Sequence, residues 1–290
     1  MAVGIVATVG QVVERPAVID VLEPGYGPLF DRAGEVLGAD LRVRALWLGG
    51  SLARGDADHL SDLDLLVAVS DDSVEGFAAG WRKWLAAITP TLIARPLPFL
   101  PGSLYAVAPG RERLDIVVEP VSAIATSGFR QRLVVFDRDG LDDVVPATTD
   151  GPGPSPGRVA ALIEEYFRDT GMFPVVLERQ DWLLGLEAVS VVRSLLYQLF
   201  VEANAPLPPM GVKRWSNKLT PQQRRVLEEL PCAVAERSSV MDTHGAVCHA
   251  FSTHAHRVAA DLGVAWPDAL DDATHRYLRG HGVPEHGATA

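Results

Sequence analysis

The chain has 290 residues, of which 48% are hydrophobic and 22% charged, a balance typical of a soluble globular protein with room for two domains. Its net charge is -11, with 13 basic and 21 acidic residues up to Gly157 and 13 basic and 16 acidic residues after it. Neither half has the basic surplus of a protein that binds nucleic acid through its phosphates, so a nucleic-acid partner is not expected. An acidic field favours a cationic small substrate, although acidity that serves only solubility explains the charge equally well.

Two cysteines are too few for a disulfide framework, which fits a reducing compartment. We recognise no signal peptide and no apolar run of the ~20 residues that a membrane span needs. The sequence therefore predicts a cytoplasmic protein without a membrane partner.

The first half alternates strand-like and helix-like segments. A helix is predicted over 73–88, where apolar residues recur at helical spacing. Apolar and β-branched runs predict strands at 42–48, 63–69, 104–107, 114–118 and 133–136. This order predicts an α/β (α+β) domain over 1–150, with a mixed sheet covered by helices.

The segment 150–158 is dense in proline and glycine and predicts a linker between domains. After it, helices are predicted at 158–168, 182–202, 221–230 and 240–262. Thr220 is the expected N-cap of the third of these, with Pro221 at its first position. The sequence thus predicts an all-α helical bundle over 158–290.

The stretch 48–69, LGGSLARGDADHLSDLDLLVAV, carries the strongest chemical signal. Gly49 and Gly50 allow a tight turn after a strand and a close approach of the backbone to a ligand. Ser51 begins a predicted short helix, whose free backbone N–H groups and serine hydroxyl suit phosphate oxygens. The next strand opens with Asp62 and Asp64.

Because side chains alternate along a strand, Asp62 and Asp64 should point to the same side, about 7 Å apart. Leu63, Leu65, Val67 and Val69 should then lie under the helices. Two such carboxylates can share a pair of divalent ions about 3.5–4 Å apart, and Asp115, which opens another apolar strand, is the expected third acid. The alternative is a pair of strand-edge aspartates beside an ordinary loop. A metal site is favoured because four features coincide: the glycine turn, the serine at a helix start, the aspartate pair that opens an apolar strand, and a later acid that opens another strand.

Gly50-Ser51 followed by Asp62-x-Asp64 resembles the signature of the DNA polymerase β-type nucleotidyltransferase superfamily. The string GGSLARGDADHLSDLDLLV is similar to that of its antibiotic-modifying members, the aminoglycoside and lincosamide nucleotidyltransferases. The resemblance implies that Asp62 and Asp64 hold Mg²⁺ on the triphosphate of ATP or another nucleoside triphosphate, two ions in all. Ser51 and the Gly50 backbone would grip the β- and γ-phosphates, and Asp115 would complete the second metal site or act as general base. Pyrophosphate would leave, and a helical domain would close over a small acceptor.

Five further residues are weaker candidates. Arg54, one turn after the phosphate-binding turn, and Lys218, in a basic segment of the second domain, are predicted to reach the triphosphate; solvated side chains are the alternative. Glu119 shares a strand face with Asp115 and is a candidate for contact with metal or acceptor. Asp181 and Glu187 are candidates for binding the amines of a cationic acceptor, or they face water.

Three classes of function remain open from the sequence. The favoured class is a nucleotidyltransferase that modifies a small, cationic acceptor such as an aminoglycoside. The second is an enzyme of the same fold that modifies a protein or RNA, of the AMPylator or toxin–antitoxin type. The third is a non-catalytic nucleotide-binding module, against which the intact carboxylates argue.

Overall fold

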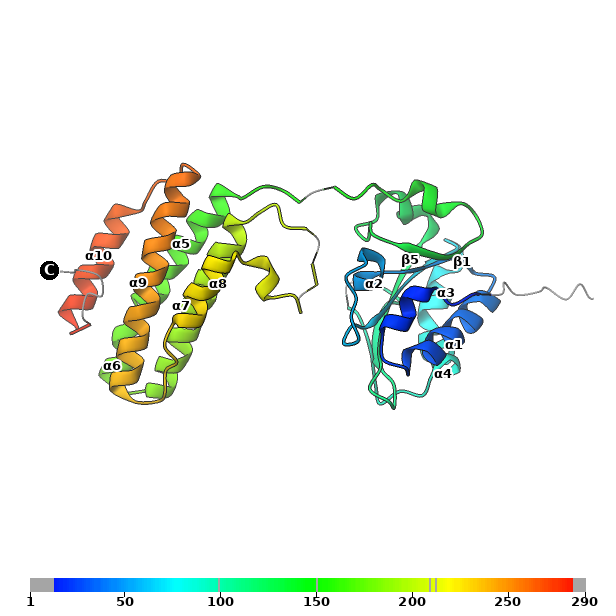
Figure 1. Ribbon diagram of the computed structural model, residues 1–290, viewed down its shortest axis with the longest axis horizontal. Coiled ribbons are helices and arrows are strands. Elements are labelled where there is room, and N and C mark those ends of the chain that lie inside the picture. The colour runs from blue at the N-terminus through cyan, green and yellow to red at the C-terminus, as the bar shows by residue number, and fades with distance from the viewer. Residues whose placement is uncertain (1–12, 99, 150, 209, 212, 284–290) are drawn as a thin grey trace, which may run out of the picture. The chain divides into compact units, whose positions relative to one another are not determined.

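A computed structural model describes residues 13–98, 100–149, 151–208, 210–211 and 213–283 (Figure 1). The chain divides into two compact units, Met1–Thr149 and Asp150–Ala290.

A six-stranded mixed sheet forms the centre of the first unit. Its spatial order is β3-β4-β5-β2-β1-β6. Only the central β2–β5 pair is parallel, and the other four pairs are antiparallel. The predicted mixed sheet is therefore confirmed. The strands are β1 (Val43–Leu48), β2 (Leu63–Val69), β3 (Ile93–Pro96), β4 (Leu104–Val107), β5 (Arg113–Pro120) and β6 (Leu133–Asp137).

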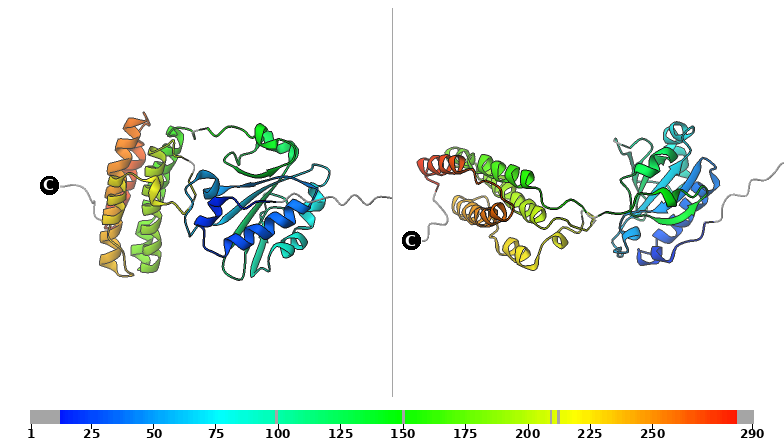
Figure 2. Two further views of the ribbon diagram at one scale, coloured as in Figure 1. Left: turned by 45° about the vertical axis from the view of Figure 1, so that its right-hand side comes forward. Right: turned by 90° about the horizontal axis from the view of Figure 1, so that it is seen from above.

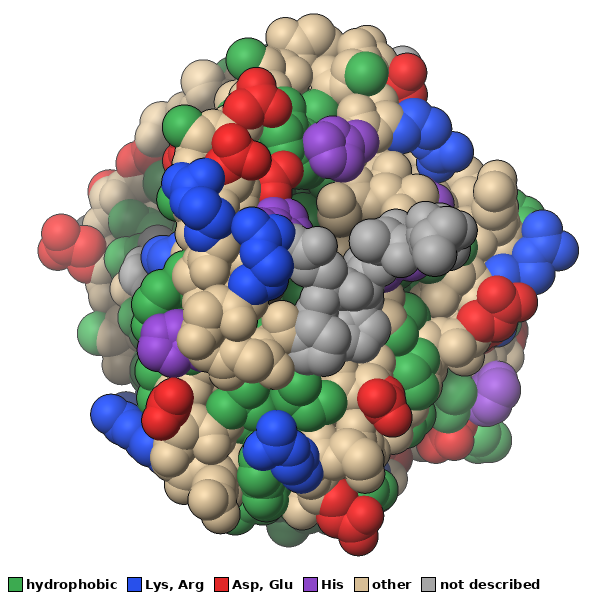
Figure 3. All heavy atoms as spheres, turned by 90° about the vertical axis from the view of Figure 1, so that its left-hand side faces the viewer, with side chains coloured by type: hydrophobic (Ala, Val, Ile, Leu, Met, Phe, Trp, Pro, Cys, Tyr) green, Lys and Arg blue, Asp and Glu red, His purple; other side chains and the backbone are tan. Residues whose placement is uncertain are grey.

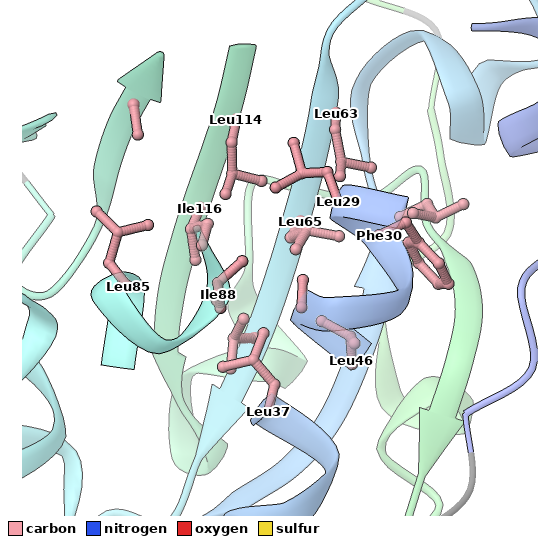
Figure 4. Packing of buried hydrophobic residues seen from close by; sticks show 14 of the residues in the cluster. Leu29, Phe30, Leu37, Leu46, Leu63, Leu65, Leu85, Ile88, Leu114 and Ile116 are labelled. Carbon is pink, nitrogen blue, oxygen red and sulfur yellow. The ribbon is translucent and has the colours of Figure 1, made fainter. Parts of the chain in front are cut away.

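Helices α1 (Tyr26–Ala39), α3 (Val74–Ala79) and α4 (Trp81–Ile88) pack on one face of this sheet. Alternate residues of the strands meet them in the main core, where Leu63 and Leu65 of β2 lie beside Leu29 and Phe30 of α1 (Figure 4). The predicted inward face of β2 is thus correct, since Leu63, Leu65, Val67 and Val69 are all buried in this cluster. Their alternation sends Asp64 to the opposite face of the sheet.

Three local features differ from the sequence prediction. The helix expected over 73–88 is two helices that meet at Gly80, a residue with low helix propensity. Helix α1 was not predicted because glycines interrupt its apolar pattern, and β3 was not predicted because it has only four residues and ends in Pro96.

The opposite face of the sheet carries a smaller core. Trp47, Leu66 and Val117 pack there with Ile124 and Leu141. The last two belong to the 3-10 helices η2 (Val121–Thr126) and η3 (Leu141–Val144). The remaining short helices of the first unit are η1 (Ala17–Val21) and α2 (Gly50–Arg54).

The second unit is all-helical, as predicted, and its longer helices lie side by side (Figure 2). Thr220 caps α8 through the N–H of Gln223 in a complete capping box, and Pro221 takes the first position, which confirms that prediction. The short α6 and the final α10 were not predicted. The elements are α5 (Pro156–Thr170), α6 (Phe173–Arg179), α7 (Trp182–Ala203), η4 (Ser216–Lys218), α8 (Pro221–Glu229), α9 (Arg237–Asp261) and α10 (Asp268–Gly280).

Helix α7 is long and apolar enough to span a membrane by length and composition, contrary to the expectation that no such run exists. Its packing gives a different reason for its composition. Val192, Leu196, Leu199 and Phe200 are at most 1% exposed and belong to the core that α7 shares with α5 and α9. Helix α7 is the central core helix of the second unit.

Candidate active site

The turn after β1 brings the backbone against the carboxylate of Asp64. The N–H of Gly49 donates to the carbonyl oxygen of Asp64 at 2.9 Å. Gly50 has φ +55°, a left-handed conformation that favours glycine. A Cβ atom at this position would lie 2.6 Å from Cγ of Asp64 and closer still to its Oδ2. The glycine therefore leaves the space that the Asp64 carboxylate occupies.

Two of the three predicted acids lie side by side on neighbouring strands. Strands β2 and β5 are parallel and in register, with Asp64 opposite Asp115. Each aspartate stands between two residues of the main core, so both point to the face opposite the helices. Neighbouring strands are about 4.8 Å apart, so the two carboxylates are close enough to bind the same pair of divalent metal ions.

The third acid, Asp62, immediately precedes β2 and is held by a residue that the sequence did not single out. Nη2 of Arg113 lies 2.5 Å from Oδ1 of Asp62, and the same nitrogen donates to the carbonyl of Leu60 at 3.2 Å. The backbone N–H of Arg113 donates to the hydroxyl of Tyr26 at 3.0 Å. Burial raises the pKa of Tyr26, so this hydroxyl stays neutral.

This arrangement bears on metal binding. Carboxylate oxygens are the ligands that Mg²⁺ prefers, and Asp62, Asp64 and Asp115 are each partly exposed. Within the described residues, however, no three acidic, histidine or cysteine side chains are arranged closely enough to hold one metal ion. The donor chemistry and strand positions fit a Mg²⁺ site, whereas the Asp62 side chain is turned toward Arg113.

The loop between α2 and β2 is tied by its own polar groups. Nε of Arg54 lies 3.2 Å from Oδ1 of Asp56. Oδ1 of Asp58 accepts from the N–H of Leu60 at 3.0 Å and from the hydroxyl of Ser61 at 3.2 Å. The guanidinium predicted to contact phosphate is therefore paired with a carboxylate in this structure.

Glu119 lies on the same face of β5 as Asp115 but has a different environment. It is 8% exposed, and its Oε1 accepts from the hydroxyl of Ser127 at 2.6 Å. Its Oε2 accepts from Nη2 of Arg132 at 2.7 Å, and Arg132 in turn stacks over the ring of Trp47. Both carboxylate oxygens are thus engaged next to the smaller core, Oε1 by the Ser127 hydroxyl and Oε2 in a buried ion pair with Arg132.

The other three candidates belong to the second unit. Asp181 caps α7, its Oδ1 accepting from the N–H of Leu184 at 3.1 Å. Glu187 is exposed on the same helix. Lys218 ends η4, and its carbonyl accepts from the side-chain amide of Asn204 at 2.8 Å. The site of the first unit is therefore made by Gly50, Asp62, Asp64 and Asp115 without them.

The second unit also contains a cavity of about 600 Å³ between α5, α9 and α10. Histidines 244, 249, 256 and 275 contribute to its lining, but none of the predicted site residues does. On the face of this unit shown in Figure 3, histidine, acidic and basic side chains are interspersed with hydrophobic ones, so no single charge dominates it.

Two residues near the acids escaped the sequence analysis, Arg113 and Tyr105. Tyr105 is the Cα partner of Asp115 on β4. The alternation of β4 shows that residue 105 faces away from the helices, but only the strand register shows that it stands beside Asp115.

Comparison with known proteins agrees with this geometry. Residues 34–94 match the family model of the nucleotidyltransferase domain, a segment that includes the glycine turn, Asp62 and Asp64. The chain carries a nucleotidyltransferase domain. This match confirms the resemblance of the segment to the nucleotidyltransferase superfamily and the assignment of the chain as a nucleotidyltransferase.

Two solved structures are similar to this nucleotidyltransferase at low identity. An aminoglycoside 6-adenyltransferase from Bacillus subtilis is 15% identical, with 92% of this chain and 99% of that chain covered and a TM-score of 0.41. A nucleotidyltransferase-like protein from Exiguobacterium sibiricum is 13% identical, with 80% and 74% covered and a TM-score of 0.36. No curated protein matches the chain. Neither structural likeness assigns a substrate to this chain, because both TM-scores lie below 0.5.

Proposed function

We propose that this enzyme transfers a nucleoside monophosphate from ATP, or another nucleoside triphosphate, to a hydroxyl of a small cationic acceptor and releases pyrophosphate. The observation that carries the proposal is the approach of Gly50 to Asp64. The left-handed glycine brings the start of α2 against the carboxylate, so that groups able to bind phosphate adjoin a group able to bind a metal ion.

Asp62, Asp64 and Asp115 would hold two Mg²⁺ ions, with Asp62 released from Arg113. Divalent ions held by these carboxylates would neutralise the charge of the triphosphate and stabilise the charge that develops during the displacement. Ser51 and the backbone of Gly50 bind the β- and γ-phosphates. Asp115 either completes the metal site or accepts the proton of the attacking hydroxyl.

The proposed reaction replaces one oxygen bonded to the α-phosphorus by another. The acceptor oxygen forms a bond to the α-phosphorus, and the bond from that phosphorus to the oxygen bridging the α- and β-phosphates breaks. The electron pair of the broken bond leaves with pyrophosphate. The hydroxyl proton passes to Asp115, or to water if Asp115 binds only metal, and the acceptor keeps the nucleoside monophosphate.

The proposed acceptor is an aminoglycoside or a related polyhydroxylated amine, modified in the cytoplasm. Support comes from the resemblance of the 48–69 segment to the antibiotic-modifying nucleotidyltransferases and from the excess of acidic residues in both halves of the chain, which attracts a polycation. Asp181 and Glu187 are proposed to bind its ammonium groups.

The test is incubation of the full chain with ATP, Mg²⁺ and a panel of aminoglycosides and lincosamides, followed by mass spectrometry. Adenylylation adds the mass of one adenosine monophosphate to an accepted compound and releases one pyrophosphate. In parallel, calorimetry measures ATP affinity with Mg²⁺ and with EDTA. Equal affinity in both conditions would overturn the metal-dependent mechanism, and transfer to a protein instead of any panel member would overturn the acceptor.

A further inference from the structure

We propose that Tyr105 is a specificity-determining residue of this enzyme and forms the surface on which a ring of the acceptor packs beside the attacking hydroxyl. The inference rests on the proposed function and adds to it the side of the sheet from which the acceptor enters. It follows from strand register, exposure and the geometry of in-line displacement.

The strand register aligns four positions in one row across the sheet. Arg95 of β3 is the Cα partner of Tyr105, Tyr105 is the partner of Asp115, and Asp115 is the partner of Asp64. Directly paired residues project to the same face. Each position in the row has strand neighbours that contact the main core, including Leu104 and Ala106 on either side of Tyr105. All four side chains therefore project on the face that carries the carboxylates.

The row has a direction because the phosphate-binding turn adjoins only one end of it. Gly49 and Gly50 follow β1, which lies on the opposite side of β2 from β5. The pyrophosphate leaves toward this turn in the proposed reaction. In an in-line displacement the attacking oxygen stands opposite the leaving oxygen, so the acceptor approaches from the side of β5 and β4.

Tyr105 is the first side chain past Asp115 on that side. It is 41% exposed, and no hydrogen bond or ring contact engages it among the residues that the structure describes. A directly opposite pair on antiparallel strands has Cβ atoms about 5 Å apart. An acceptor whose hydroxyl reaches Asp115 therefore has its adjoining ring over Tyr105.

The chemistry of this surface defines the part of the acceptor that meets it. A tyrosine offers a flat apolar face and a hydroxyl at its edge, which suits the C–H face of a sugar ring or an aromatic ring that carries hydroxyls. Arg95 continues the row at the next strand and is exposed. Its positive charge disfavours an ammonium group at this edge, so the acceptor presents an uncharged ring here and directs its amines elsewhere.

The test compares Tyr105→Ala with Tyr105→Phe in the full chain, using kanamycin and lincomycin as probes with ATP and Mg²⁺. We expect Tyr105→Ala to raise the KM for the accepted probe about tenfold, as the loss of one ring-packing contact implies, with less than a threefold change in kcat. Tyr105→Phe keeps the ring and should restore most of the affinity. Tyr277→Ala, at an exposed tyrosine of the second unit, is the matched control and should leave the KM unchanged.

The affinity for ATP with Mg²⁺, measured by calorimetry, distinguishes a failure of the role given to Tyr105 from a failure of the proposed function. Unchanged ATP affinity with a raised acceptor KM supports the assignment. An acceptor KM within twofold of wild type in Tyr105→Ala, or a comparable loss of ATP affinity, would overturn it. Absence of ATP binding or of transfer to both probes in the wild-type enzyme would overturn the proposed function itself, together with the acceptor ring inferred here.

Discussion

Arg113 holds Asp62, with Nη2 of the arginine 2.5 Å from Oδ1 of the aspartate at the start of β2. The Asp62 side chain is only 17% exposed, whereas that of Arg113 is 44% exposed. Since the carboxylate is also a proposed metal ligand, the guanidinium and a divalent ion compete for the same oxygen.

Replacing this arginine should strengthen divalent-ion binding in the absence of nucleotide. A partly exposed ion pair contributes about 1 kcal/mol at most, so Arg113→Ala should tighten Mn²⁺ binding by up to about fivefold. Electron paramagnetic resonance titration of free Mn²⁺ measures this directly. Arg44→Ala, which removes a comparable pair with Asp139 elsewhere on the sheet, is the control and should leave Mn²⁺ affinity unchanged. Weaker Mn²⁺ binding in Arg113→Ala would show that the arginine supports the site.

Two glycines near the site form a matched pair of substitutions. Gly50 and Gly55 both have positive φ, +55° and +76°, so alanine costs about 1–2 kcal/mol of conformational strain at either position. A Cβ at Gly50 would collide with the Asp64 carboxylate, whereas nothing lies within 4 Å of one at Gly55. Gly50→Ala should therefore lower kcat/KM at least about a hundredfold, and Gly55→Ala less than about threefold. Similar activities for the two variants would contradict the role given to Gly50.

Removing the charge of either strand-opening aspartate should abolish transfer and preserve the fold. Asp62→Asn and Asp64→Asn keep the side-chain shape but lose a metal-binding charge, so each should retain less than about a tenth of wild-type activity. Circular dichroism and thermal unfolding check the fold. Asp62→Asn should lose about 1 kcal/mol at most from its pair with Arg113. Activity above a tenth of wild type would be incompatible with a direct metal ligand.

Glu119 should matter for stability. The side chain of its partner Arg132 is 1% exposed, and removing one member of a buried ion pair costs about 3–5 kcal/mol. Glu119→Gln should lower the urea midpoint accordingly. Asp139→Asn breaks the more exposed pair with Arg44 and should cost about 0–1 kcal/mol. A stable Glu119→Gln variant with a raised acceptor KM would instead place Glu119 in substrate binding.

The two cysteines should differ in reactivity. Burial raises the pKa of the Cys248 thiol to about 12, while Cys232 is exposed. Because the thiolate is the reactive form, Cys248 stays protonated and unreactive at pH 8. One equivalent of an aromatic disulfide reagent should react with the native protein and two with the unfolded protein. Rapid reaction of native Cys232→Ser would show that Cys248 is accessible.

The sequence by itself determined the elements that local chemistry dictates. The apolar, β-branched run 63–69 predicted the strand, and because successive side chains of a strand point to opposite faces, it also predicted that Asp64 lies on the face opposite Leu63 and Leu65. The glycine turn, Ser51 and Asp62-x-Asp64 predicted the nucleotidyltransferase domain. They could do so because all of these residues lie within one short segment, so that their order and spacing are visible in the sequence. Thr220 and Pro221 predicted the start of α8 for the same local reason.

Only the tertiary structure decided which distant residues meet. The register between β2 and β5 sets Asp64 beside Asp115, and the antiparallel pairing of β4 then adds Tyr105 to the row. The fold also pairs Glu119 with Arg132 and Asp62 with Arg113. The sequence does not show which carboxylate forms an ion pair with an arginine and which stays available for a metal ion. These pairings join residues from separate strands and loops, so they depend on how strands are ordered and shifted against one another. No local pattern encodes that order, because it results from packing the whole sheet against its helices.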